Sequence, residues 1–195
     1  MKKRILAVFL GVALFQIAPL ASATDVDSRP LLDEARKVSG RLLGEIRGEL
    51  VRELERSGPV RAIIVCKYSA PETAAAISRE TGMRVTRVSL RPRNRTIGEP
   101  DVWEQQILLD FERRVSAGEK AEGLEQSEIV AEPAGRYFRY MKAIPMGQPC
   151  LACHGPAENI SEAVRAKLNG EYPHDQGINY RLGQVRGAVS IKKPL

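Results

Sequence analysis

The sequence predicts an α+β fold in which an antiparallel sheet carries flanking helices and a long N-terminal helix. Segments with helical periodicity dominate the first half of the chain, whereas short β-branched segments separated by turn residues dominate the second half. The 195 residues are 28% charged and 43% apolar, which is typical of a globular protein with one domain of ordinary size.

The first residues have the pattern of an export signal. A basic start over residues 2–4 precedes an apolar stretch over residues 5–20 and a small-residue cleavage site at residues 21–23. The apolar stretch is short and interrupted, so an uncleaved membrane anchor is the less favoured alternative. We therefore expect a signal peptide over 1–23, cleaved near Ala23, and a mature protein that is periplasmic or otherwise exported and does not span a membrane.

A long helix is predicted over residues 24–58. Apolar residues recur there at three- and four-residue steps with charges between them, as expected for a helix with one buried face. They are Leu31, Ala35, Val38, Leu42, Ile46, Leu50 and Leu54. Ser57-Gly58-Pro59 is a combination that ends helices. We expect this helix to pack along the domain formed by residues 59–195, with contact between two copies in a homodimer as the alternative.

Periodicity and turn residues divide the remaining chain into shorter elements. They predict a helix over 71–81, a strand over 83–90, a basic loop over 91–100, a helix over 101–117, strands over 128–132 and 136–143, an irregular segment over 145–156, a helix over 159–168 and a strand over 186–192. The spacing of Asn159 and Glu162 suits a capping box at the start of its helix. The state of residues 60–65 stays open, because a short apolar run suits either a helix or a strand.

Residues 150–154, Cys-Leu-Ala-Cys-His, match the C-x-x-C-H pattern of covalent haem attachment. The two thiols add across the two haem vinyl groups, and two intervening residues let both thiols reach them from one short turn. The imidazole of His154 then projects toward the iron, for which neutral imidazole is a good ligand. We therefore expect one covalent haem c, held by Cys150, Cys153 and His154.

Three other arrangements of the cysteines compete with haem attachment. A zinc site built from Cys66, Cys150, Cys153 and a histidine would need the adjacent Cys153 and His154 to bind one tetrahedral ion, which is awkward. A redox-active disulfide of the thioredoxin type would need a βαβ unit, which the pattern does not predict. A structural disulfide would leave one of the three cysteines of an exported chain without a partner.

The second axial ligand of the iron must come from another part of the chain. Cys66 follows an apolar run and precedes a polar turn, so it suits the edge of a pocket, although a buried inert thiol is the common case. His174 could reach the iron, or it could be an exposed loop residue beside Asp175. The residues alone leave Cys66 and His174 equally placed, and they favour both over the methionines of the mature chain.

A series of short stretches, in order along most of the mature chain, matches a known family. They are Ala62-Ile63-Ile64-Val65-Cys66 with Ala70-Pro71, Arg87-Val88-Ser89-Leu90-Arg91-Pro92-Arg93-Asn94, Pro100-Asp101-Val102-Trp103-Glu104, Cys150 to Gly155, Tyr172-Pro173 with Asp175, and Arg186-Gly187-Ala188-Val189-Ser190. With these stretches the chain resembles a family of exported single-haem c-type proteins with a PAS-like fold. That family was long catalogued as a domain of unknown function, and it includes a cyanobacterial soluble haem protein.

The resemblance has implications for the fold and the site. It implies a PAS-like antiparallel sheet with the long helix outside it, and a haem iron bound axially by His154 and by the thiolate of Cys66. It also places Arg91 and Arg93 near the haem propionates, with an ordinary solvated basic loop as the alternative. The chain departs from the family pattern in the basic loop after Asn94, and again at Gly177, where the family usually has alanine.

A His/thiolate ligand pair predicts a low-potential electron carrier rather than an enzyme. A thiolate stabilises ferric iron, and two protein ligands leave no open iron position for catalysis. The expected partner is an unidentified redox protein. The alternative function is a haem-based redox or gas sensor in which Cys66 is exchangeable and a small gas binds in its place. The formal charge of +6 falls to +3 without the three basic residues of the signal, which argues against a nucleic-acid partner.

Overall fold

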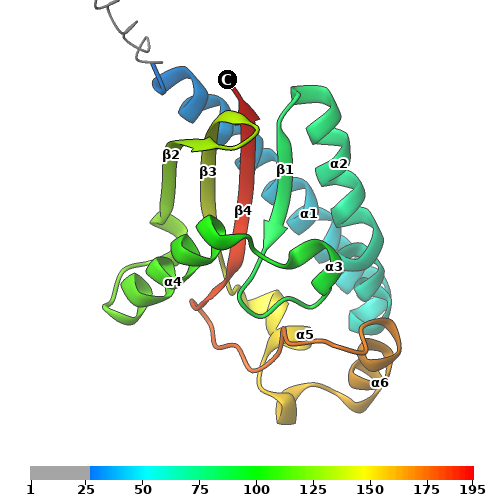
Figure 1. Ribbon diagram of the computed structural model, residues 1–195. Coiled ribbons are helices and arrows are strands. Elements are labelled where there is room, and N and C mark those ends of the chain that lie inside the picture. Colours follow the sequence, from blue (N-terminus) through cyan, green and yellow to red (C-terminus); the bar gives the residue numbers. More distant parts are fainter. Residues whose placement is uncertain (1–26) are drawn as a thin grey trace, which may run out of the picture.

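A computed structural model describes residues 27–195, and the predicted signal peptide over 1–23 lies outside the described residues. One antiparallel sheet has the strand order β1-β4-β3-β2 (Figure 1). The strands are β1 (Arg84–Val88), β2 (Glu125–Glu132), β3 (Gly135–Pro145) and β4 (Val185–Pro194). The α-helices are α1 (Arg29–Ile64), α2 (Ala70–Thr81), α3 (Arg95–Gly98), α4 (Val102–Ser116), α5 (Leu151–His154) and α6 (Glu162–Glu171). The predicted α+β class with an antiparallel sheet is confirmed.

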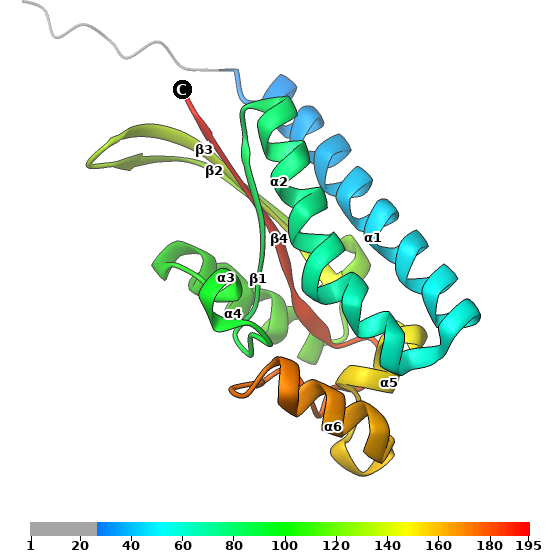
Figure 2. The same cartoon turned by 90° about the vertical axis from the view of Figure 1, so that its right-hand side faces the viewer.

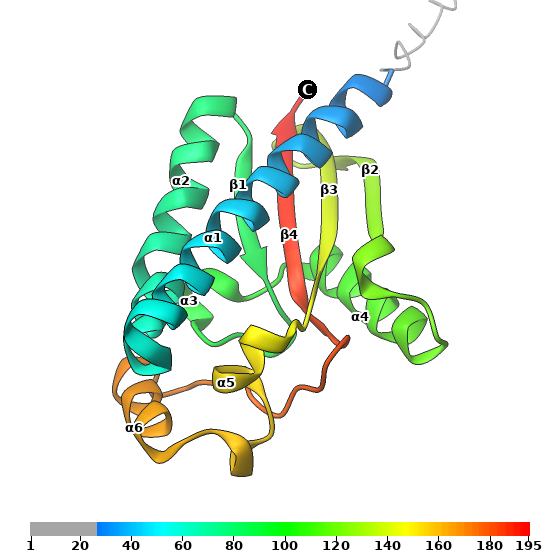
Figure 3. The same cartoon turned by 180° about the vertical axis from the view of Figure 1, so that it is seen from behind.

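The helices α1 and α2 lie side by side over one face of the sheet (Figure 2, Figure 3). Within α1 the backbone leaves the helical conformation at Gly58, with φ 74° and ψ 176°, and Pro59 follows. Glycine adopts a positive φ without steric cost, so this position allows a sharp kink. The predicted helix end at Gly58 is confirmed as this kink, and residues 60–64, whose state was open, continue as helix.

The long helix shares its apolar face with the core of the sheet. This core contains Ala35, Val38, Leu42 and Ile46 of α1, Ala74 and Ile77 of α2, and Val85, Phe138, Tyr140, Val189 and Ile191 of the strands. The residues from α1 are those whose three- and four-residue spacing predicted a buried face. The predicted packing of this helix along the domain is therefore confirmed, and contact between two copies stays a prediction.

The helix α4 covers part of the opposite face of the sheet (Figure 2). It begins with a capping box, in which the Asp101 carboxylate accepts from the Glu104 amide and the Glu104 carboxylate accepts from the Asp101 amide. Leu108 and Phe111 of α4 are fully buried in a second core with Met141 of β3. The predicted helix over 101–117 is confirmed to within a residue at each end.

Residues 146–184 connect β3 to β4 and carry α5 and α6 at one end of the sheet (Figure 1). The predicted start of α6 at Asn159 is wrong: Asn159 closes a preceding 3-10 turn, and the Ser161 side chain caps α6 by accepting from the Val164 amide at 3.4 Å. The helix also continues beyond its predicted end to Glu171. Within residues 27–195, no helix is both long and apolar enough to cross a membrane.

Candidate functional site

A cavity of about 1050 Å³ lies where the α1–α2 pair, the sheet and the segment around α5 meet. Its volume is at the upper end of the range for cofactor sites, roughly 300–1,000 Å³. Its wall is mostly apolar, with contributions from α1, α2, β1 and the end of β3. Cys66, Cys150, Cys153 and His154 all line it. The fold therefore brings together the predicted haem-binding residues, although Cys66 is more than eighty residues from the others.

Two consecutive short turns position the cysteine pair and the histidine. A 3-10 turn over Gln148–Cys150 leads directly into α5, so the chain stays wound from the first cysteine to His154. Residues three apart on a helical turn are neighbours on one side. Burial raises the pKa of the Cys150 thiol and raises that of Cys153 to about 11, and the charge on Cys66 adds to both increases. All three thiols are free and share one electrostatic environment.

The imidazole of His154 is oriented by a contact with the backbone carbonyl of Gly177. Its Nδ1 lies 2.5 Å from the carbonyl oxygen of Gly177 and 3.2 Å from Arg186 Nε, which is a donor. A hydrogen on Nδ1 satisfies the shorter contact, because a carbonyl oxygen can only accept, and it excludes a hydrogen bond from Arg186. Burial lowers the pKa of the imidazole well below its ordinary value, and the cations Arg186 and Arg93 lower it further. The ring is therefore neutral, with the Nε2 lone pair available. This is the arrangement that metal-binding histidines usually have.

The predicted propionate residues Arg91 and Arg93 have protein partners. Arg93 is buried, pairs with Asp175 at 2.9 Å, and also donates to the carbonyl oxygens of Cys153 and Gly177. Arg91 donates to a backbone carbonyl at 3.2 Å and stacks 3.7 Å from the centre of the Tyr180 ring. Their contacts hold the loop around the cysteine pair together. Contact of either guanidinium with a propionate stays a prediction.

Cys66 lies in an unusual piece of helix. Residues Val65–Ser69 form a π-helix between α1 and α2, so the polar turn expected after Cys66 is wrong. A short π-helix inside an α-helix contains one extra residue per turn, which changes the direction of the side chains, and it often occurs at functional sites. The next residue, Lys67, pairs with Glu171 at the end of α6. This ion pair ties the segment that carries Cys66 to the segment that carries the cysteine pair.

The alternatives to haem find little support in the fold. His174 is exposed and does not line the cavity, so the structure separates it from the predicted site. Over residues 27–195, no three His, Cys, Asp or Glu side chains converge as they would around a zinc ion. The sheet is antiparallel throughout, so the cysteine pair lacks the βαβ setting of a thioredoxin.

Sequence reasoning missed two arginines of the cavity wall. Arg87 and Arg186 both line the cavity, and Arg186 Nε lies 3.2 Å from Nδ1 of His154. A Cβ at Gly177 would lie 2.7 Å from Arg186 Nη2, which gives a physical reason for glycine at this position. The position of Arg87 could have been predicted from the sequence. It lies two residues after Val85 on a predicted strand, so the two side chains share the face that should be apolar.

A family model described as Tll0287-like matches residues 21–194. The chain belongs to the Tll0287-like family. This confirms the resemblance inferred from the short sequence stretches, and the matched region includes every residue that lines the cavity.

One solved structure is similar to this Tll0287-like chain over most of its length. It is the crystal structure of the cyanobacterial heme-protein Tll0287, with a TM-score of 0.65 and 22% sequence identity. The match covers 85% of this chain and 96% of that chain. At this identity the likeness establishes the fold. No curated protein sequence matches the chain.

Proposed function

We propose that this protein is an exported c-type haem protein that transfers electrons and is not an enzyme. Thioether bonds from Cys150 and Cys153 hold one covalent haem, and His154 and Cys66 bind its iron. The proposal includes export through the segment 1–23, a separate redox protein as partner, and no nucleic-acid or membrane-spanning role. The similar fold of a protein described as a cyanobacterial heme-protein supports the choice of cofactor.

The observation that carries the proposal is the meeting of four residues on one cavity. Cys66, Cys150, Cys153 and His154 line a mostly apolar space of about 1050 Å³. Such a space suits a large, flat, apolar ring whose iron needs one ligand on each side. The cysteine pair and the histidine belong to one short segment, whereas Cys66 belongs to the π-helix that joins α1 and α2.

The residues of the chain have separate tasks in this proposal. The bound haem supplies a one-electron couple at its iron. The Gly177 carbonyl fixes the His154 ring with Nε2 free. Cys66, as a thiolate, favours the ferric state and a low reduction potential. The mostly apolar wall would exclude water from a bound haem, and His154 and Cys66 would hold its iron in both oxidation states.

One observation favours a sensor as the second candidate function. Cys66 is part of a π-helix, a rare conformation that occurs mostly as a single turn inside an α-helix and often at functional sites. If Cys66 leaves the iron on reduction, Val65–Ser69 can return to α-helical winding, and a small gas can bind at the vacated position. The shift in winding then moves Lys67 and its ion pair with Glu171.

Spectra of the exported protein test the proposal, together with a haem stain after denaturing electrophoresis. Wild type should retain haem through denaturation, and the double variant Cys150→Ala/Cys153→Ala should lose it. Cys66→Ser should keep covalent haem but change the absorption and electron spin resonance spectra of the oxidised protein and raise the reduction potential. The matched control is His174→Ala, which removes the exposed alternative ligand and should change none of these.

Each result decides a separate part of the proposal. A wild-type protein that loses haem on denaturation contradicts covalent attachment. Unchanged spectra in Cys66→Ser remove Cys66 as a ligand, and a change in His174→Ala would assign that position to His174. Carbon monoxide distinguishes the two functions: rapid binding to the reduced wild type supports the sensor, and no binding supports the electron carrier.

A further inference from the structure

Arg87 occupies a position on β1 where the pattern calls for an apolar side chain. Its cross-strand partner is Val189, and Val85, two residues earlier, pairs with Ile191. Val85, Val189 and Ile191 all belong to the core beneath α1 and α2. Because directly opposed residues in an antiparallel pair share a face, the Arg87 side chain points to this same side. There it lines the cavity.

The guanidinium of Arg87 has no hydrogen-bond or ion-pair partner among residues 27–195. Arg47, Arg79 and Arg84 of the cavity wall also have none among these residues, but they are exposed, whereas Arg87 is half-buried. Arg93 pairs with Asp175, and Lys67 pairs with Glu171. Burial lowers the pKa of Arg87, and the negative charge of Cys66 is the largest influence in the other direction. The Arg87 side chain is half-buried and lines the cavity, so a group that fills the cavity would desolvate this cation and favour an anionic partner in the complete site.

The candidate anion within the described chain is the thiolate of Cys66, which lines the same cavity and whose charge acts on Arg87. We propose that Arg87 is the counter-charge that stabilises the Cys66 thiolate as an iron ligand. The inference rests on the proposed function, because it needs Cys66 at the iron. Arg87 is thus a positioning residue: it acts on the iron through the ligand, by drawing negative charge from the sulfur.

Tyr172 is another polar residue of the cavity wall that the charges of Arg87 and Cys66 both influence. It lines the cavity, is only 7% exposed, and its hydroxyl has no hydrogen-bond partner in the described part of the chain. Burial raises the pKa of its hydroxyl to about 12, and the next influences are the charge of Cys66 and those of Arg93 and Arg87. Arg87, Tyr172 and Cys66 therefore form one electrostatic group.

The test measures the reduction potential of the haem-loaded protein, a property that loss of a merely structural contact would not move in a set direction. Arg87→Gln removes positive charge beside the sulfur, so ferric iron becomes more favourable and the potential falls. Arg87→Lys keeps the charge and should restore most of the wild-type potential. The matched control is Arg113→Gln, which removes the same charge from an exposed position on α4 and should leave the potential unchanged.

The background of Cys66→Ser separates the thiolate from a haem propionate as the anion. If Arg87 acts on the thiolate, the shift caused by Arg87→Gln should be at least twofold smaller in that background. The electron spin resonance spectrum should respond to Arg87→Gln only when Cys66 is present. Equal shifts in both backgrounds would assign Arg87 to a propionate and overturn the inference, as would no shift at all.

A second variant and separate readouts distinguish failure of this inference from failure of the proposed function. Arg87→Gln breaks no hydrogen bond or ion pair of the side chain within residues 27–195, and Arg87→Met, which fills the same space with an apolar chain, should give the same downward shift. Loss of covalent haem in wild type contradicts the proposed function before Arg87 is tested. Unchanged spectra in Cys66→Ser contradict its role as ligand, whereas a normal response to Cys66→Ser with no response to Arg87→Gln contradicts this inference alone.

Discussion

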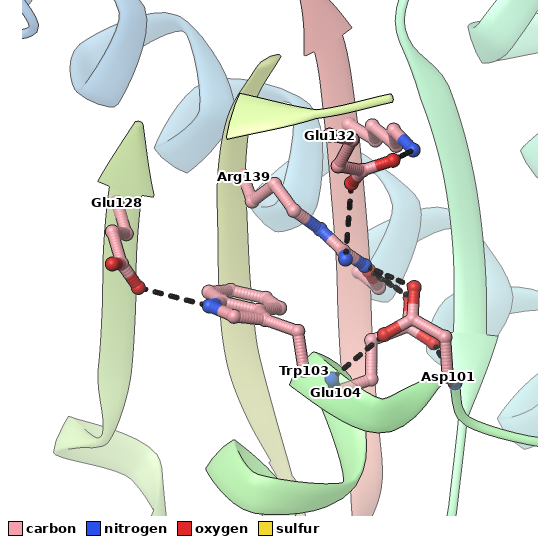
Figure 4. Close-up of polar contacts among 8 residues, drawn as sticks. Asp101, Trp103, Glu104, Glu128, Glu132 and Arg139 are labelled. Carbon is pink, nitrogen blue, oxygen red and sulfur yellow. Dashed lines mark hydrogen bonds and ion pairs between the residues drawn. The ribbon is translucent and has the colours of Figure 1, made fainter. Parts of the chain in front are cut away.

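Arg139 and Arg87 lie on opposite faces of the same sheet and differ in what surrounds the guanidinium. Arg139, on β3, has a side chain that is 3% exposed and is paired with Asp101 at 2.6 Å, Glu104 at 3.3 Å and Glu132 at 3.5 Å (Figure 4). It also lies 4.5 Å from the centre of the Trp103 ring. Arg87 lines the cavity and has no such partner in the described residues.

The difference in partners indicates that Arg139 is a structural charge, whereas Arg87 is a charge available to a ligand. Each carboxylate around Arg139 comes from a different local position: the start of α4, its first turn, and the end of β2. The chain supplies this anionic shell itself, so the charge is neutralised without a cofactor, although Arg139 Nε is buried without a hydrogen-bond partner in the described residues. The cavity wall that carries the cysteines offers Arg87 and apolar surface, and a ligand would have to supply the anion.

The largest effect is expected from removing the complete group. Arg139→Met leaves buried Glu104 without its cation, which should lower the free energy of unfolding by about 3 kcal/mol. Urea unfolding of the haem-loaded protein measures it. The surface control Arg113→Met should stay within about 0.5 kcal/mol of wild type. Arg87→Met should cost less than Arg139→Met, because no carboxylate loses a partner; a larger cost would show that Arg87 is structural.

The sequence was sufficient for the fold because local pattern and tertiary packing agree. The apolar spacing of α1 predicted the face that is buried, the turn residues before Gly135 predicted the hairpin of β2 and β3, and Gly58 marked the kink. The α6 start failed for a local reason: two capping residues, Asn159 and Ser161, lie two positions apart, and the chain uses the second.

The site was predicted only in part, because some of its contacts are between distant segments. The cysteine pair and His154 form a local motif. The π-helix at Cys66 has no spacing signature, and residues alone could not choose between Cys66 and His174. The resemblance implies Cys66, which lines the cavity whereas His174 does not, and its ligation of iron stays a prediction. The contact between His154 and the Gly177 carbonyl could not be predicted, because every residue type carries a backbone carbonyl.

Arg186 is intermediate between Arg139 and Arg87, and Gly177→Ala tests how firmly it is held. Its Nη1 donates to Ser89 Oγ at 2.9 Å and to the Arg91 carbonyl at 3.3 Å, without a carboxylate. A Cβ at position 177 would crowd Arg186 Nη2, and the displacement should cost about 1 kcal/mol in urea unfolding. The control is Gly147→Ala, whose Cβ would meet only ordinary contact at 3.7 Å. Equal stability of both variants would show that Arg186 moves freely.

The smallest effect is a pH dependence of the Arg139 group. Burial raises the pKa of Asp101, but the Arg139 guanidinium and the Glu104 amide lower it more, so it lies below its ordinary value of 3.8. A carboxyl with a lowered folded-state pKa contributes stability above its unfolded pKa, and that contribution is lost as the pH falls through the folded value. The Asp101 side chain is 42% exposed, so solvent screens the effect.

Asp101→Asn isolates this contribution, because asparagine caps a helix about as well as aspartate. The urea midpoint of wild type should exceed that of the variant at pH 6, and the difference should narrow as the pH is lowered from about 4 toward 3. In the Arg139→Met background the difference should lose most of its pH dependence, since the cation that lowers the pKa is absent. A gap that stays constant from pH 6 to 3 would mean that the carboxylate charge contributes nothing, and the Arg139 group would then depend on Glu104 and Glu132.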